Sequence, residues 1–197
     1  MADYYEDNHE TYHEVTFSVD PTPVLEPLQA RLAPGSRVLD VGCGSGRDMA
    51  WFAARGHHCT GVERSPGLAR LAREHTGCPV IQDDMRVVDF AGLASDAVLA
   101  IGTLVHLPRV EMPGMLSRIS ASLGGDGHLL VSMKEGRGSV VRADGRVNVL
   151  WTDAGLRVVF SSLGFHVADF SRRTSLVNPA DTWIAYVLRA RGAVRPW

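Results

Sequence analysis

The stretch "VLDVGCGSGRD", residues 38–48, constrains the fold more than any other part of the sequence. A short apolar run that contains Asp40 is followed by glycines at alternate positions, Gly42, Gly44 and Gly46, and then by a helical pattern. Such a run is typical of a buried strand, and a glycine-rich turn after it lets a ligand approach the backbone closely. Because ligands bind at the carboxyl ends of the strands in open α/β sheets, the stretch predicts a binding site.

Apolar runs alternate with helical patterns along the rest of the chain. Strands are predicted at residues 37–41, 57–63, 79–82, 96–102, 128–134, 165–173 and 182–190, and helices at 48–55, from Ser65-Pro66 onward, at 112–123 (ended by Gly124-Gly125) and at 156–163. This alternation predicts a mostly parallel sheet with helices on both faces. The eight residues 174–181 are too few for a helical crossover, so the last two strands should pair antiparallel.

The bulk properties of the chain indicate one ordinary globular domain. A length of 197 residues is enough for one core, and a net charge of −2 offers no footprint for nucleic acid or an anionic membrane. The three cysteines form no CxxC pair, which argues against a disulfide framework and a zinc site. The acidic N-terminus is unlike a signal peptide, and no apolar run is long enough for a membrane span. A cytoplasmic location is therefore expected, without a metal.

The spacing of charges around the glycines narrows the class of ligand. The pattern is GxGxG rather than the GxGxxG of dinucleotide-binding folds, because Arg47 stands where the third glycine would be. Asp40 would repel a pyrophosphate but could receive an ammonium group. Glu63, seventeen residues past Gly46, could accept hydrogen bonds from both hydroxyls of a ribose. These features favour a ligand with a ribose and a cationic amino acid part, and they disfavour an NAD-linked oxidoreductase.

With these residues, the chain resembles the class I S-adenosylmethionine-dependent methyltransferases. The motifs that carry the resemblance are "VLDVGCGSGRD", "GVERS", "IQDDM", "DAVLAIGTLVHLP" and "LGGDGHLLVSMKEG", within residues 20–190. The opening "YYEDNHETYHEVTF" is similar to small bacterial members near the tellurite-resistance and small-molecule methyltransferases. The resemblance implies a single-domain α/β fold with a seven-stranded, mostly parallel sheet of order 3-2-1-4-5-7-6, in which strand 7 is antiparallel.

The resemblance also implies where the cofactor S-adenosylmethionine, and its product S-adenosylhomocysteine, would bind. The implied cofactor-binding residues are Asp40, Gly42, Gly44, Gly46, Arg47, Glu63, Arg64, Asp84, Met85 and Ile101. Asp84 would receive the adenine amino group and Met85 would pack on the ring, with the adjacent Asp83 as the rival acceptor. Arg47 could pair with the methionine carboxylate, or Asp48 beside it could simply favour the helix N-terminus.

The acceptor side of the site is less marked. His106, in "TLVHLP", is the candidate catalytic base, because imidazole titrates near neutrality; the favoured alternative is that it only packs or caps the next helix. The three tyrosines Tyr4, Tyr5 and Tyr12 favour a lid formed by residues 1–20 over a methyltransferase domain at 21–197; the alternative is a solvated aromatic tail. Trp151 is expected beside the substrate. The cations of residues 135–150 could attract an acidic substrate, although a solvated hairpin is the preferred interpretation.

The predicted function is methyl transfer to an O, N or S nucleophile of a small-molecule acceptor, without nucleic acid or membrane partners. Because the sulfonium is already activated, the protein has mainly to align and desolvate the nucleophile. The alternative is a non-catalytic S-adenosylmethionine-binding sensor or a partner subunit of an active enzyme.

Overall fold

The structure of the chain is a computed structural model, and it describes residues 4–190. Residues 1–3 of the predicted lid and 191–197 of the predicted domain lie outside the described residues. The helices are α1 (Tyr4–Asp7), α2 (His9–Thr16), α3 (Thr22–Gln29), α4 (Arg47–Ala53), α5 (Pro66–Thr76), α6 (Met112–Ser120) and α7 (Asp153–Ser162). The strands are β1 (Arg37–Val41), β2 (His58–Glu63), β3 (Val80–Gln82), β4 (Ser95–Ile101), β5 (Leu123–Lys134), β6 (Ser139–Val141), β7 (Val147–Val149), β8 (Phe165–Thr174) and β9 (Thr182–Ala190).

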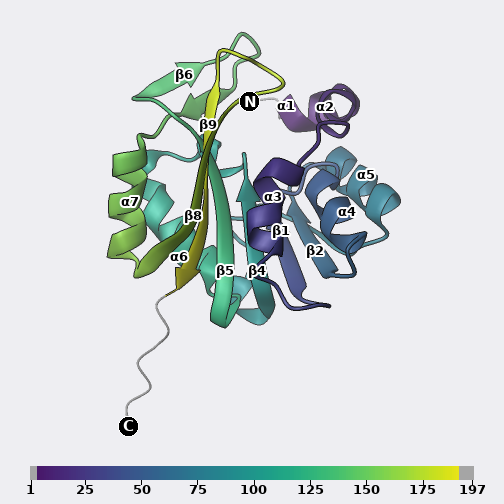
Figure 1. Cartoon of the computed structure of the whole chain (residues 1–197). Helices are drawn as coiled ribbons and strands as arrows, with labels where there is room; N and C mark the ends of the chain where they lie inside the picture. The colour runs from purple at the N-terminus through teal and green to yellow at the C-terminus, as the bar shows by residue number, and fades with distance from the viewer. Residues whose placement is uncertain (1–3, 191–197) are drawn as a thin grey trace.

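Seven strands form one sheet in the order β3-β2-β1-β4-β5-β9-β8 (Figure 1). The pairs β1–β2, β2–β3, β1–β4 and β4–β5 are parallel. Strand β9 runs antiparallel to both β5 and β8. Since β8 and β9 are the sixth and seventh strands of this sheet along the chain, the predicted order 3-2-1-4-5-7-6 with an antiparallel strand 7 is confirmed.

Helices cover both faces of the sheet, and each face has its own hydrophobic core. On one face, Leu25 and Leu28 of α3 pack with Phe52 of α4 against the sheet. On the other, Leu116 of α6 packs with Phe160 of α7. Figure 1 shows α3, α4 and α5 on one side of the sheet and α6 and α7 on the other. Both clusters arise because the apolar residues of each helix recur at helical spacing and form one buried stripe.

Two local expectations are corrected. The helix predicted at 112–123 ends at Ser120, and β5 begins at Leu123, so that Gly124 and Gly125 lie inside a strand instead of ending a helix. The reason is pairing, because Leu123 is the register partner of Ser95 at the start of β4. The irregular stretch 135–150 contains the antiparallel hairpin β6–β7.

The N-terminal helices lie beside the sheet, on α5. The carboxylate of Glu6 in α1 accepts hydrogen bonds from Ser65 Oγ at 2.5 Å and from the Gly67 amide at 3.0 Å. The ring of His9 rests on Gly67, where an added Cβ would lie 2.5 Å from the nearest ring atom. Within residues 4–190, no helix has the length and apolar character needed to cross a bilayer.

Candidate active site

A cavity of about 980 Å³ opens at the carboxyl ends of β1, β4 and β5. Its walls come from the glycine turn after β1, the end of β4, the hairpin β6–β7, the β8–β9 loop and the helices α1 and α2. Of the predicted site residues, those that line it are Asp40, Gly42, Gly44, Arg47, Ile101, His106, Tyr4, Tyr5 and Tyr12. Residues far apart in the sequence thus meet where a parallel sheet is expected to bind ligands.

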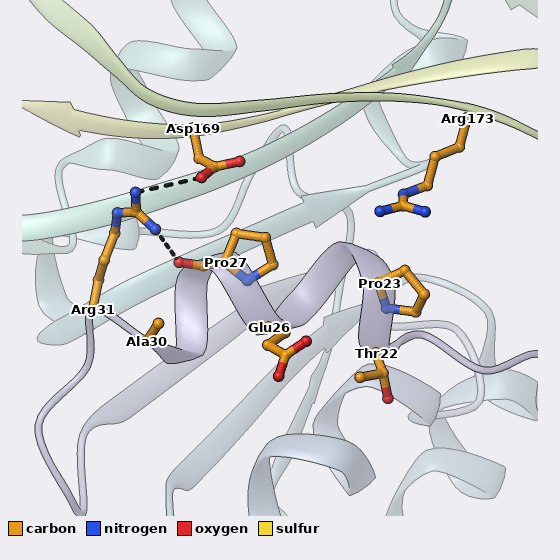
Figure 2. A pocket seen from close by; sticks show the side chains of 8 residues that line it. All are labelled: Thr22, Pro23, Glu26, Pro27, Ala30, Arg31, Asp169 and Arg173. Atoms are coloured by element: carbon orange, nitrogen blue, oxygen red, sulfur yellow. Dashed lines mark hydrogen bonds and ion pairs between the residues drawn. The ribbon is translucent and has the colours of Figure 1, made fainter.

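A second, open hollow of about 620 Å³ lies between α3 and β8. Figure 2 shows its prolines, Pro23 and Pro27, and the ion pair between Arg31 and Asp169, whose closest atoms are 3.5 Å apart. The glycine turn does not line this hollow. We therefore place the site in the larger cavity.

The three glycines of the turn have different structural roles, although all have positive φ angles of 74°, 56° and 88° for Gly42, Gly44 and Gly46. A Cβ on Gly42 would collide with the side chain of Thr103. A Cβ on Gly46 would lie 3.1 Å from the Ala72 Cα, so this glycine brings α5 close and does not line the cavity. At Gly44 the nearest neighbour of a Cβ would be the Tyr12 ring, at 3.6 Å, so the tyrosine stands over the turn.

Asp40 is a buried carboxylate that faces the cavity without a partner. It is only 3% exposed, and no described residue hydrogen-bonds to its side chain. Arg47, the nearby cation, is committed to Asp48, with Nε 2.7 Å from Oδ1. Burial, followed by the repulsion of Asp48, raises the pKa of Asp40 well above its usual range. The carboxyl group is therefore prepared for a cationic ligand group, whose approach would offset both effects.

Glu63 lies behind the glycine turn rather than in the cavity wall. One carboxylate oxygen accepts a hydrogen bond from the Gly44 amide at 2.9 Å, and the other accepts one from the Ser65 amide at 2.8 Å. Burial raises the pKa of Glu63, whereas these backbone donors oppose the shift. The residue thus ties the turn to the end of β2, a role that its position in the sequence did not reveal.

The residues expected around adenine, Arg64, Asp84 and Met85, follow β2 and β3 and do not line this cavity. Asp84 accepts a hydrogen bond from the Arg86 amide at 2.8 Å, and Met85 packs on the hydrophobic core. Helix α1 lies at the end of β2, through the contacts of Glu6 with Ser65 and Gly67. In the arrangement seen here, α1 and α2 therefore occupy the approach to the end of β2, and the cofactor roles of these residues stay predictions.

Tyr5 and His106 meet in the cavity. The Tyr5 hydroxyl lies 2.7 Å from His106 Nε2, and His106 Nδ1 lies 2.9 Å from the Val147 carbonyl oxygen. A carbonyl can only accept, so Nδ1 carries the proton and Nε2 accepts from Tyr5. The guanidinium of Arg146 lies 4.0 Å from the centre of the Tyr4 ring and donates to the Tyr5 hydroxyl at 3.4 Å.

Trp151 requires a correction. It was expected beside the substrate, but it is 5% exposed, belongs to the hydrophobic core and does not line the cavity. Its ring lies under the guanidinium of Arg109, 4.2 Å from the ring centre. The segment after β7 runs beside the end of β5, where the Trp151 amide donates to the Lys134 carbonyl at 3.0 Å and the Gly136 amide donates to the Trp151 carbonyl at 3.0 Å. The tryptophan is consequently held in the core.

The hairpin side contributes polar groups to the cavity, of which Asn148 and Asp181 were not among the residues expected from the sequence. Lys134, Arg142, Asn148 and Asp181 all line the cavity, so the charges of residues 135–150 do not belong to a merely solvated hairpin. Alternation in β7 was the available signal, because Asn148 stands between Val147 and Val149 and must point to the opposite side from both. Within the described residues, no cluster of three or more His, Cys, Asp or Glu side chains could hold a metal ion.

Comparison with known proteins gives a domain match and structural neighbours. A family model described as a methyltransferase domain matches residues 38–127. A ubiquinone biosynthesis O-methyltransferase from Xanthomonas axonopodis pv. citri is 39% identical over 106 residues, which cover 50% of this chain and 43% of that protein. The chain thus matches less than half the length of these curated relatives.

Two solved structures illustrate the likeness of fold. The 1,6-didemethyltoxoflavin-N1-methyltransferase of Burkholderia thailandensis, crystallised with 1,6-didemethyltoxoflavin and S-adenosylhomocysteine, has a TM-score of 0.75 and 26% identity over 94% of this chain and 83% of its own. A TehB-like SAM-dependent methyltransferase from Corynebacterium glutamicum has a TM-score of 0.70 and 19% identity over 92% of this chain and 97% of its own. At that identity the second comparison speaks for the fold alone.

Proposed function

We propose, from the premise that this chain carries a class I S-adenosylmethionine-dependent methyltransferase domain, that it transfers a methyl group from this cofactor to an oxygen, nitrogen or sulfur atom of a small molecule. The premise rests on the domain match and on the strand order. What we propose beyond this premise is the class of methyl acceptor and the role of each residue in the site.

The observation that carries the proposal is the unpartnered carboxylate of Asp40 at the glycine turn. It is buried and lines the cavity. A buried carboxylate without a partner is costly, and the ammonium of the cofactor's methionine part would relieve that cost. Gly42 and Gly44 line the same wall and expose backbone rather than side chain to the cavity, so these residues fit the cofactor.

The cofactor residues, in this proposal, are those that the sequence predicts. Asp40, Gly42, Gly44 and Arg47 hold the methionine part, and Gly46 supports the turn from behind by its contact with α5. Ile101 faces the junction with adenosine, and Glu63, Arg64, Asp84 and Met85 serve the ribose and adenine. Because α1 lies at the end of β2, the adenosine groups reach the second set only when the N-terminal helices move. Residues 1–20 therefore act as a lid.

Bound S-adenosylmethionine supplies a methyl group on a positively charged sulfur, which needs no further activation. His106 acts as the general base, because its Nε2 lone pair is free of a proton and faces the cavity. The Tyr5 hydroxyl donates a hydrogen bond to this lone pair until the acceptor displaces it. Tyr12 lies over the glycine turn. Closure of the lid excludes water, which favours attack by an aligned nucleophile.

The pairing of Tyr5 with His106 also favours an enzyme over a non-catalytic binding protein. A sensor needs the cofactor groups but has no use for a neutral imidazole held in one tautomer inside the cavity. The structural alternative, in which His106 only caps a helix, does not explain why both of its nitrogens are engaged across the cavity.

Calorimetric titration of the purified chain tests the proposal. S-adenosylmethionine and S-adenosylhomocysteine should bind, and NAD should not. At about a hundred times its dissociation constant, each sulfur ligand should stabilise the fold by roughly 2.7 kcal/mol. Comparable affinity for NAD, or no heat with either sulfur ligand, contradicts the assignment.

A further inference from the structure

Asn148, at the centre of β7, is a buried amide without a partner. It is 4% exposed, and no described residue hydrogen-bonds to its side chain. It also lines the cavity. Its amide atoms are not among the buried side-chain atoms that lack a partner, so within the described residues they are open to the cavity. The amide of Asn148 is therefore available to a ligand group that enters the cavity.

Two cations stand in the same cavity wall and share one carboxylate. Lys134 Nζ lies 2.9 Å from Asp181 Oδ2, and the guanidinium of Arg142 bonds to Asp181 Oδ1. The Lys134, Asp181 and Arg142 side chains are only 12%, 14% and 20% exposed. One carboxylate cannot neutralise two cations, so this group has an excess of one positive charge. The Lys134 ammonium has three N–H donors and gives one of them to Asp181, so it has donors left for a ligand.

The charges of the cavity are separated between its two ends. At the glycine turn, Asp40 and Asp48 stand against the single cation Arg47, an excess of one negative charge. At the hairpin, Arg146 is paired with Asp144, with 2.7 Å between the closest atoms, so this pair leaves the excess on Lys134 and Arg142 unchanged. A cationic ligand part is favoured at the first end and an anionic part at the second.

We infer that Asn148, Lys134 and Arg142 form the recognition subsite for the methyl acceptor, and that the acceptor presents a planar anionic group of the carboxylate type to it. A carboxylate offers the lone pairs that the Asn148 amide N–H groups, the ammonium and the guanidinium all require. The ring of Trp183 also lines the cavity, 5.3 Å from Lys134 Nζ, and offers an aromatic surface to the body of the acceptor. This inference rests on the proposed function, since it names the acceptor class of that reaction.

The test uses the full chain saturated with S-adenosylhomocysteine and two matched pairs of probes. The probes are benzoate and 4-hydroxybenzoate, each compared with its neutral carboxamide by calorimetric titration. We expect the carboxylates to bind about tenfold more tightly than the carboxamides. The variants Asn148→Ala and Lys134→Gln should each weaken carboxylate binding by about tenfold. Arg137→Gln is the matched control, because Arg137 is an exposed cation that does not line the cavity, and it should change nothing.

The outcomes separate the inference from the proposed function. If S-adenosylhomocysteine does not bind, the proposed function fails. If it binds but the carboxamides bind as well as the carboxylates, or neither class binds, the anionic subsite is overturned and methyl transfer stands. Should Asn148→Ala fail to fold, Asn148→Asp replaces it, because this variant keeps the size of the side chain and repels an anion. Unchanged carboxylate affinity in Asn148→Asp also overturns the subsite.

Discussion

The Tyr5 hydroxyl donates a hydrogen bond to His106 Nε2 across 2.7 Å, although the two residues are 101 positions apart in the chain. The contact ties the first helix to the short helix Leu104–His106 that follows β4. Burial lowers the pKa of His106, and the nearby cation Arg146 adds to this shift. The imidazole is therefore neutral at pH 7 and able to accept a proton.

The variant His106→Gln should lose about 10²–10⁴-fold in the rate of methyl transfer, the usual contribution of a general base. Its affinity for S-adenosylhomocysteine should be unchanged. In the parent protein, protonation of His106 below its lowered pKa removes the base, so the rate should fall on the acidic side of about pH 6.5. The pH profile of kcat checks this, and an acidic limb that persists in His106→Gln would assign the titration to another group.

The variant Tyr5→Phe separates the roles of the two residues. It removes the donor to Nε2 but leaves the imidazole and its Val147 contact intact. Because Tyr5 only orients the base, we expect a loss of several-fold in kcat, far smaller than that of His106→Gln. Equal losses in the two variants would make Tyr5 a direct participant in proton transfer.

The variant Glu63→Ala should weaken both the turn and the cofactor site. It removes the acceptor of the Gly44 and Ser65 amides, and hydrogen bonds to a charged group contribute about 1.5–3 kcal/mol each. We expect the free energy of unfolding, measured in urea, to fall by about 2–4 kcal/mol and S-adenosylhomocysteine to bind about a hundredfold more weakly. Glu74→Ala, which removes an exposed acid of α5, is the control. If the free energy of unfolding falls by the expected amount but the affinity for S-adenosylhomocysteine is unchanged, the role of Glu63 is limited to holding the turn.

Asp40 should make the ligand-free protein less stable as the pH rises. Its pKa is raised in the folded state, so the folded protein binds this proton more tightly than the unfolded chain does. The resulting stabilisation is complete below the ordinary aspartate pKa of about 3.9 and is lost as the pH rises through the raised pKa. In Asp40→Asn this dependence is absent, so the stability of the variant relative to the parent should increase with pH. Urea unfolding of both proteins at several pH values measures the difference, and a constant difference would refute the burial argument.

The lid can be released without deleting it, through Gly67→Ala. The new Cβ would lie 2.5 Å from the His9 ring, while alanine suits the first turn of α5 well. We expect S-adenosylhomocysteine to associate faster, because α1 and α2 leave the end of β2 more readily, and methyl transfer to fall. Deletion of residues 1–18 should exaggerate both effects in a protein that still unfolds cooperatively. Stopped-flow binding and calorimetry check this; a truncated chain that does not fold would place the helices in the core.

The sequence patterns determined most of the elements and the antiparallel pairing of the last two strands, whereas the order of the sheet was implied by the family resemblance and is confirmed. Apolar runs at strand spacing and stripes at helical spacing are local patterns, and the short connection between β8 and β9 allowed only antiparallel pairing. The same local patterns placed Asp40 and the glycine turn at the end of β1, which the structure confirms. The end of α6 was predicted wrongly because Gly124 and Gly125 are common helix-ending residues in a local pattern. Pairing of β5 with β4, which is not local, places both glycines in a strand instead.

Only the tertiary structure decided which distant side chains meet. Tyr5 reaches His106, Glu63 bonds to the amides of the turn, and Trp151 enters the core, because packing and hydrogen bonding between separate segments select one arrangement among many that the sequence allows. The inward face of Asn148 follows from the docking of the hairpin on the end of β5. Periodicity describes each segment by itself, whereas the free energy of burying a polar group depends on the neighbours that the fold brings to it.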